Sequence, residues 1–286
     1  MSHGDLARRV RGFIGRREAA RRVIRPFLRV PPGRRWLFVV GCYNSGTTLL
    51  QALLARSPTC TTLPLEGVVL TSQLWAPELE GWPRMWWKVW RGQVARKPGD
   101  VADPERVKRD WCIWLDRDRP VFLEKSISNT TRMPWLAEHF EGARFVHILR
   151  NGYAVAEGIR RRAGTGRVRL PEGLSRYPIE WCATQWVRSA DVLAQATAEI
   201  GADLVFTLRY EDLCRSPAEW LGRVGEFAGL QELSGGDLSH VRDMNRDALS
   251  RLSAEDMAAV NRVAAGDIER LGYEVLIADR LPGGET

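Results

Sequence analysis

The chain has 286 residues, of which 44% are hydrophobic, and this is enough for a sizeable core in one α/β domain. No run reaches the roughly 18 apolar residues that a membrane helix needs, and no N-terminal apolar stretch resembles a secretion signal. The five cysteines are widely spaced and form no metal-ligand pattern, so we expect reduced thiols in a cytoplasmic protein.

The net charge of +7 is concentrated at the N-terminus. Residues 1–35 carry eleven arginines and a net charge of +9, so the remaining 251 residues carry −2. Apolar residues such as Leu6, Val10 and Ile14 recur there at helical spacing. Two interpretations stay open: a solvated helix that packs on the domain, or an interfacial helix that meets anionic lipid or another anionic partner. The rest of the chain has no basic stripe with interleaved aromatic residues, so we do not expect nucleic-acid binding.

A proline-glycine break at Arg29–Arg35 separates this tail from a body, residues 36–286, in which strands alternate with helices. The expected strands are Trp36–Val40, Val121–Glu124, Arg144–Leu149 and Asp203–Tyr210. The expected helices are Thr47–Arg56, Met133–Phe140, Asn151–Arg162, Ile179–Ile200, Pro217–Ala228 and Ala254–Leu271. The alternation predicts one three-layer α/β/α domain with a mostly parallel sheet of about four or five strands, covered by helices on both faces.

Residues 75–114 interrupt this alternation between the first helix and the second expected strand. They hold seven of the twelve tryptophans, namely Trp75, Trp82, Trp86, Trp87, Trp90, Trp111 and Trp114. Ordinary burial explains some of them, but indole rings also suit stacking on sugars or apolar acceptors. Because pocket lids are often such insertions, we predict a helical insertion that acts as an acceptor lid, with part of its tryptophans facing the acceptor.

A phosphate-binding loop is predicted where the first strand becomes the first helix. Backbone N–H groups and the helix dipole favour an anion there, and Gly46 lets the backbone approach it closely. Thr47 and Thr48 add hydroxyl donors. Simple capping of the helix by Ser45 or Thr47 is the alternative. The loop lacks the Gly-Lys pair of an ATP or GTP site, which argues against a nucleotide kinase or NTPase.

With Ser45-Gly46-Thr47-Thr48 in this setting, the chain resembles the sulfotransferases that use 3′-phosphoadenosine 5′-phosphosulfate (PAPS), and most of all the branch of tyrosylprotein sulfotransferases and their bacterial relatives. The resemblance extends from about Trp36 to Tyr273 and implies a P-loop-type fold. It also implies that the loop from Asn44 to Leu49 binds the 5′-phosphosulfate of PAPS, and we predict that no metal is required. The family usually has Lys or Arg where this chain has Asn44, and asparagine carries no charge.

The resemblance extends to the segment FVHILRNGYAVAEGIRRR. It implies that Arg150, at the end of a strand, binds the 3′-phosphate. Gly158 stands eight residues later, where the family usually has a serine, and Arg162 stands twelve residues later, matching an arginine of the tyrosylprotein branch. Gly158 and Arg162 share one helix face, and paired guanidinium groups suit a dianionic phosphate. A solvated helix end is the alternative for Arg162.

Two further motifs complete the predicted nucleotide site. LRYEDL places Tyr210 at the nucleotide, although a core tyrosine at a strand end would have the same sequence context. In the closing segment, Ser250 and Arg270 match positions that contact the nucleotide in the tyrosylprotein branch.

The resemblance also implies the catalytic groups. None of the four histidines follows the second expected strand, where cytosolic family members keep a catalytic histidine. Tyrosylprotein-type enzymes use a glutamate just after the first helix, and Glu66 stands there as the predicted general base. Lys125, at the end of the second expected strand, takes the role of stabilising the transferring sulfuryl group. A capping glutamate and a surface lysine are the respective alternatives.

The predicted function is sulfuryl transfer from PAPS to a hydroxyl acceptor. The tryptophan-rich insertion favours a carbohydrate, glycolipid or small natural product over a protein tyrosine. Because of Asn44 and Gly158, a catalytically weakened nucleotide-binding scaffold stays open as an alternative. We expect a cytoplasmic, bacterial protein; peripheral membrane contact through residues 1–35 and a homodimer are left open.

Overall fold

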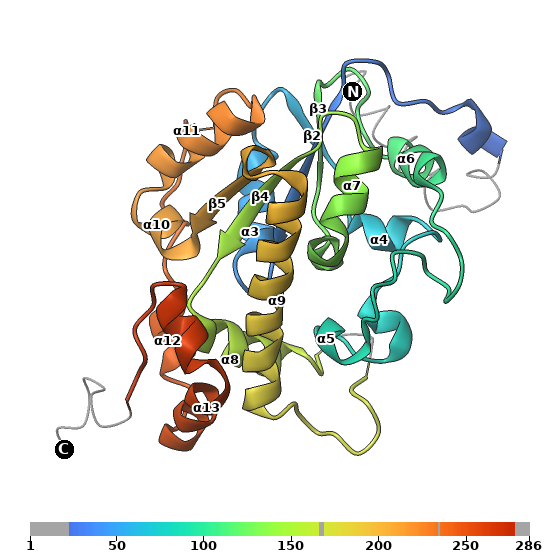
Figure 1. Cartoon of the computed structure of the whole chain (residues 1–286). Coiled ribbons are helices and arrows are strands. Elements are labelled where there is room, and N and C mark those ends of the chain that lie inside the picture. The colour runs from blue at the N-terminus through green and yellow to red at the C-terminus, as the bar shows by residue number, and fades with distance from the viewer. Residues whose placement is uncertain (1–22, 166–168, 234, 278–286) are drawn as a thin grey trace.

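The computed structural model describes residues 23–165, 169–233 and 235–277, and its centre is a five-stranded sheet (Figure 1). The strand order is β2-β3-β1-β4-β5, and every neighbouring pair is parallel. The strands are β1 (Arg35–Gly41), β2 (Cys60–Thr62), β3 (Val121–Glu124), β4 (Arg144–Leu149) and β5 (Val205–Arg209). The predicted parallel α/β fold is therefore confirmed. The edge strand β2 was not predicted, because three residues are too few to show a strand pattern.

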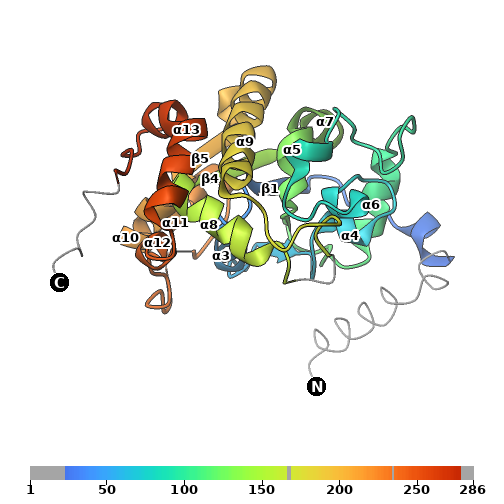
Figure 2. The ribbon, with the colours of Figure 1, turned by 90° about the horizontal axis from the view of Figure 1, so that it is seen from below.

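Helices cover both faces of the sheet (Figures 1 and 2). The α-helices are α3 (Thr47–Leu54), α4 (Gly67–Leu70), α5 (Trp86–Val89), α6 (Pro104–Cys112), α7 (Met133–His139), α8 (Gly152–Arg162), α9 (Ile179–Ile200), α10 (Tyr210–Arg215), α11 (Pro217–Ala228), α12 (Asn245–Leu249) and α13 (Ala254–Arg270). Short 3-10 helices are η1 (Arg25–Phe27), η2 (Pro77–Glu80), η3 (Ile127–Arg132) and η4 (Ala202–Leu204). No α-helix among the described residues combines the length and the hydropathy needed to cross a bilayer.

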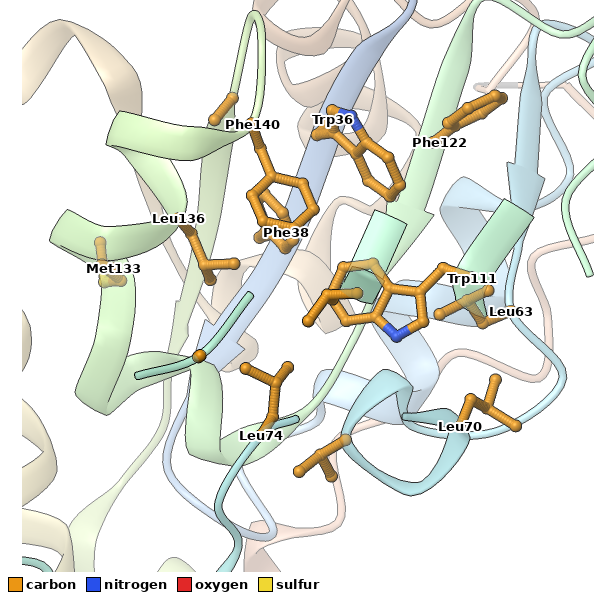
Figure 3. Close-up of a cluster of buried hydrophobic side chains, with 14 of the residues drawn as sticks. Trp36, Phe38, Leu63, Leu70, Leu74, Trp111, Phe122, Met133, Leu136 and Phe140 are labelled. Carbon is orange, nitrogen blue, oxygen red and sulfur yellow. The ribbon is translucent and has the colours of Figure 1, made fainter. Parts of the chain in front are cut away.

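Strand β1 shows why the sheet needs helices on both sides. Its side chains alternate between two buried clusters, since successive strand residues point to opposite faces. Trp36 and Phe38 pack with residues of α6, α7 and α9, whereas Leu37 and Val39 pack with α3 and α11. Figure 3 shows the first cluster, in which Trp36 meets Phe140 edge to face at a centroid distance of 4.9 Å.

The parallel sheet brings the predicted site residues to one edge. All five strands end at that edge, and each is followed within four residues by a predicted site residue: Asn44 after β1, Glu66 after β2, Lys125 after β3, Arg150 after β4 and Tyr210 after β5. In the sheet, β2 and β3 lie on one side of β1, and β4 and β5 lie on the other, so the strand order changes direction at β1. Ligands of open α/β sheets bind at such a switch point in the strand order.

The tryptophan-rich insertion folds onto the main core. It contains η2, α5 and α6, and Trp75, Trp86 and Trp111 are at most 2% exposed. Before it, Arg25 of η1 forms an ion pair with Asp110 of α6 at 2.5 Å, which ties the end of the basic tail to the domain. The membrane-contact hypothesis concerns residues 1–35, and residues 1–22 of this segment lie outside the described residues. The five cysteines are all free thiols, four of them buried.

Candidate functional site

A cavity of about 590 Å³ opens at the carboxyl edge of the sheet, within the range of about 300–1,000 Å³ typical of ligand pockets. Eleven of the fourteen predicted site residues line it: Asn44, Gly46, Thr47, Thr48, Leu49, Glu66, Lys125, Arg150, Gly158, Arg162 and Tyr210. They come from segments that are far apart in the chain, so the parallel sheet is what assembles the site. The three that do not line the cavity are Ser45, Ser250 and Arg270.

The loop between β1 and α3 has the form of an anion cradle. Gly46 is the N-cap residue of α3, has a φ of 102° and provides no side-chain cap. The first N–H groups of a helix lack partners within the helix, so those that follow Gly46 are available to a ligand. Ser45 does not cap the helix, because Gly46 is the N-cap residue and no N–H of α3 donates to the Ser45 hydroxyl, which itself donates to the carbonyl oxygen of Cys42 at 2.6 Å. The simple capping alternative for Ser45 is therefore wrong.

Tyr210 supports this loop from the end of β5. A β-carbon at Gly46 would lie 2.7 Å from Cδ2 of the Tyr210 ring, so only glycine fits there. The Tyr210 hydroxyl donates to the carbonyl oxygen of Arg242 at 3.0 Å and accepts from the N–H of Met244 at 3.1 Å. Burial raises the pKa of Tyr210 to about 12, so the hydroxyl stays protonated at neutral pH.

Arg150 is held in place before any ligand arrives. Its Nε donates to Oδ1 of Asn245 at 2.8 Å, and its Nη1 donates to the carbonyl oxygen of Asn44 at 2.9 Å. The guanidinium also lies 4.2 Å from the centre of the Tyr210 ring, a cation–π contact. Arg150 is only 9% exposed. A fixed, nearly buried guanidinium that still lines the cavity is well suited to a phosphate group.

Arg162 faces the same cavity without a partner. Its guanidinium makes no hydrogen bond or ion pair with any residue that the structure describes, whereas its neighbour Arg161 is paired with Glu157 at 2.8 Å. Burial, and then the nearby guanidinium groups of Arg161, Arg84 and Arg150, lower the pKa of Arg162. Such crowding of like charges is relieved when an anion binds among them.

The two predicted catalytic residues contact each other. Nζ of Lys125 donates to Oε1 of Glu66 at 2.7 Å, across 59 residues of sequence. The side chain of Lys125 is 9% exposed and that of Glu66 is 35% exposed, so the pair lies at the boundary between the core and the cavity. A carboxylate, a group that can act as a base, therefore stands beside a cation that can stabilise negative charge.

Two predicted residues lie away from this centre. Ser250 is exposed, and its hydroxyl donates to the carbonyl oxygen of Asp247. Arg270 stands in the last turn of α13 and pairs with Asp267 at 2.6 Å and with Asp191 of α9 at 3.1 Å. Because these acidic residues hold the guanidinium on the surface, Arg270 does not reach the cavity in this arrangement. The neighbour of Ser250, Arg251, does line it.

The insertion contributes charged residues to the cavity instead of indoles. Glu78, Pro83 and Arg84 line it, and none of the seven tryptophans of residues 75–114 does. Burial, and then the charge of Glu66, raise the pKa of Glu78. The guanidinium of Arg84 lies 5.9 Å from the centre of the Tyr43 ring and makes no hydrogen bond or ion pair with a described residue. Glu78 and Arg84 stand between Trp75 and Trp86 in the sequence, and these charges among the tryptophans were the sequence signal for this wall.

A cradle of helix N–H groups at the switch point of a parallel sheet defines a P-loop-type nucleotide-binding α/β protein. The model of the sulfotransferase family matches residues 37–235. The chain belongs to this family and is a PAPS-dependent sulfotransferase. The nucleotide kinase and NTPase alternative is thereby excluded.

Two animal proteins are related to the chain over much of its length. Protein-tyrosine sulfotransferase A of Caenorhabditis elegans is 23% identical over 267 residues, which cover 84% of this chain and 67% of that protein. Protein-tyrosine sulfotransferase of Drosophila melanogaster is 21% identical over 197 residues, which cover 67% of this chain and 37% of that protein. The chain thus matches only part of the length of these relatives.

Solved sulfotransferase structures share the fold. Sulfotransferase STF9 of Mycobacterium avium superposes with a TM-score of 0.55 at 17% identity, covering 92% of this chain and 83% of that one. The sulfotransferase domain of the curacin biosynthetic pathway gives a TM-score of 0.53 at 17% identity, covering 85% and 99%.

Proposed function

We propose that this protein transfers the sulfuryl group of PAPS to a phenolic hydroxyl, with Glu66 as general base and Lys125 as the cation at the sulfuryl group. The observation that carries this proposal is the 2.7 Å contact between Lys125 Nζ and Glu66 Oε1 in the cavity beside the cradle of α3. When bound, PAPS supplies an activated sulfuryl group and leaves as 3′-phosphoadenosine 5′-phosphate (PAP).

The residues present fit such an anionic co-substrate. The residues at the start of α3, whose N–H groups have no partner within the helix, line the cavity, and Arg150 and Arg162 add two guanidinium groups for a phosphate. The side-chain nitrogen of Asn44 is buried and has no hydrogen-bond partner among the described residues, so it is a donor in need of an acceptor. Phosphate or sulfate oxygens are such acceptors.

Glu66 and Lys125 have different roles in the transfer to the acceptor. A carboxylate within reach of the acceptor hydroxyl takes up its proton as the oxygen attacks. The ammonium of Lys125 holds Glu66 in place and offers its remaining N–H donors to the charge that develops during transfer. The guanidinium of Arg84 also lines the cavity and pairs with no described carboxylate, and we assign to it the charge that Asn44 lacks.

A tyrosine side chain is the acceptor that we favour. A carbohydrate acceptor was expected because of the tryptophans, yet none of them lines the cavity, and the insertion presents Glu78 and Arg84 there. The related animal proteins are named protein-tyrosine sulfotransferases. A phenol has a pKa of about 10, so it gives up its proton to a carboxylate base more readily than a sugar hydroxyl does.

The test is transfer from radiolabelled PAPS to three acceptors: a tyrosine-containing peptide, the same peptide with phenylalanine in place of tyrosine, and a neutral oligosaccharide. Label only on the tyrosine peptide supports the proposal, and label on the oligosaccharide overturns the choice of acceptor. Glu66→Gln should lower kcat by at least about 100-fold, the lower end for a lost general base. Glu138→Gln is the control, since that side chain is 73% exposed on α7.

A weakened nucleotide-binding scaffold is the second candidate, and the uncharged Asn44 is the observation that favours it. Calorimetry with PAP separates it from the enzyme. Tight PAP binding without label on any acceptor would support the scaffold, whereas turnover at any rate that depends on Glu66 would exclude it.

A further inference from the structure

Helix α4, the single turn that follows Glu66, is too short to orient itself. Glu66 is its N-cap residue, and the helix spans only Gly67–Leu70 without a side-chain cap. Helices of this length are unstable in isolation, because their few hydrogen bonds do not offset the free-energy cost of nucleation. The direction in which the Glu66 carboxylate points is therefore set by what holds this turn from outside.

The end of strand β3 and the residues that follow it hold the turn on one side. The N–H of Gly67 donates to Oε1 of Glu124 at 2.7 Å, and the N–H of Val68 donates to the hydroxyl of Ser126 at 3.1 Å. Glu124 and Ser126 flank Lys125 in the sequence. The two backbone hydrogen bonds thus fix the start of α4 to the residues on either side of the lysine, and this sets the register that lets Glu66 meet Lys125.

Helix α6 holds the same turn on the other side. The indole N–H of Trp111 donates to the carbonyl oxygen of Gly67 at 2.9 Å. In Figure 3 the Trp111 indole lies beside the turn that ends at Leu70, with its nitrogen toward that turn. A β-carbon at Gly67 would lie 2.7 Å from the Trp111 ring and 2.8 Å from Oε1 of Glu124, so glycine alone fits between them.

The Glu124 carboxylate is itself immobilised. It is fully buried and accepts from the hydroxyl of Ser126 at 2.5 Å and from the side-chain amide of Asn129. Burial raises the pKa of Glu124, and the buried guanidinium of Arg132 lies near enough to interact with its charge. A carboxylate that accepts hydrogen bonds from this many donors is held in one orientation, and this makes Glu124 a rigid anchor.

We propose that Glu124, Ser126 and Trp111 are positioning residues that clamp the first turn of α4, so that the carboxylate of Glu66 faces Lys125 and the acceptor. This inference rests on the proposed role of Glu66 as the base. It also gives the insertion a function other than stacking on an acceptor, because Trp111 supports the turn that carries the base.

The test compares kcat, KM for the acceptor and PAP affinity in four variants. Ser126→Ala and Glu124→Leu remove the anchors of the turn. A misplaced catalytic group costs about 100-fold in rate, so we expect kcat to fall by about that factor for Glu124→Leu and by about tenfold for Ser126→Ala, which leaves the Glu124 bond in place. PAP affinity should stay within about twofold, since the phosphate cradle belongs to other strands.

Glu124→Gln is the conservative variant. Its amide oxygen still accepts from Gly67, and its amide nitrogen takes the place of the oxygen that accepts from Nδ2 of Asn129. This nitrogen can donate to Oδ1 of Asn129 once the Asn129 amide turns over, since that oxygen is buried and has no partner among the described residues. We expect it to restore most of the kcat lost in Glu124→Leu. Ser128→Ala is the matched control: Ser128 lies in the same loop, is 3% exposed, and its hydroxyl contacts no described polar partner.

A kcat unchanged in Ser126→Ala and Glu124→Leu, while Glu66→Gln is inactive, would overturn the clamp and leave the base assignment intact. Full activity of Glu66→Gln would instead overturn the base assignment. Should Glu124→Leu fail to fold, the ratio of kcat between Ser126→Ala and Ser128→Ala still decides: equal values contradict the clamp, and a lower value in Ser126→Ala alone supports it.

Discussion

The side chain of Asn44 packs against the α-carbon of Gly158: a β-carbon at position 158 would lie 2.9 Å from Cβ and 3.0 Å from Cγ of Asn44. Asn44 also has a φ of 61°, in the left-handed region that few residues other than glycine and asparagine adopt. The resemblance to PAPS-dependent sulfotransferases marked both positions as departures from the usual family residues. Because they touch, the departures form one local arrangement, and a side chain at 158 would displace the turn that carries Asn44.

Replacing Gly158 by serine should therefore weaken the nucleotide site instead of restoring a family contact. Overpacking of this kind costs about 1–3 kcal/mol, so we expect PAP affinity to fall by about tenfold or more. The measurement is calorimetry with PAP. Gly222→Ala is the matched control, since Gly222 is also helical and has open space around its α-carbon. Adding Asn44→Gly to Gly158→Ser should recover part of the affinity, since it relieves the overpacking but removes the Asn44 donor; an increase in affinity in Gly158→Ser alone would contradict the coupling.

Arg84 should carry the charge that Asn44 does not. We expect Arg84→Ala to lower kcat by about 100-fold, as for the loss of one group that stabilises developing charge. Arg84→Lys, which keeps the charge, should retain more activity. Asn44→Arg in the Arg84→Ala background should restore part of the rate, because it returns a cation to the cradle. A normal kcat in Arg84→Ala would show that Lys125 and the helix dipole suffice.

The buried histidine of β4 should make stability depend on pH. Burial lowers the pKa of His147 from 6.5 to about 4. Between pH 6.5 and pH 4, His147 is protonated in the unfolded chain but neutral in the folded protein. The free energy of unfolding therefore falls as the pH drops from 6.5 toward 4, by up to about 3 kcal/mol. Urea unfolding of His147→Gln and wild type at pH 7 and pH 4.5 measures this loss. His139→Gln, on a partly exposed helix end, should behave as wild type; an equal loss in His147→Gln and wild type would contradict the assignment.

The partly exposed tryptophans of the insertion should matter for stability and not for acceptor binding. Trp82 stacks on Tyr177 with ring planes 7° apart and centroids 6.2 Å apart. Trp82→Ala should lower the free energy of unfolding by about 2–3 kcal/mol, toward the low end for a large-to-small change. KM for the acceptor should stay unchanged, whereas Glu78→Gln, which alters a cavity residue, should shift it. A KM for the acceptor that rises in Trp82→Ala without a loss of stability would show that the indoles contribute to the acceptor site.

The sequence by itself determined the parts of this protein that depend on local pattern. The runs around β1, β3 and β4 are apolar and end in polar residues, so their strand bounds were predicted to within one residue. The strand–glycine–helix layout identified the cradle, since the free N–H groups of a helix start are a property of the segment itself. The sequence also placed Lys125, Arg150 and Tyr210 at the ends of expected strands, and all three line the cavity.

Only the tertiary structure decided which groups contact each other there. The pairing of Glu66 with Lys125, the clamp of Glu124 and Trp111 on Gly67, and the contact of Asn44 with Gly158 all join distant segments. Such contacts depend on strand order and side-chain packing over the whole domain, which no local pattern encodes. The same reason explains why Arg270 matched a family position by sequence but is held on the surface by acidic residues, and why charged residues of a tryptophan-rich insertion, not its indoles, line the cavity.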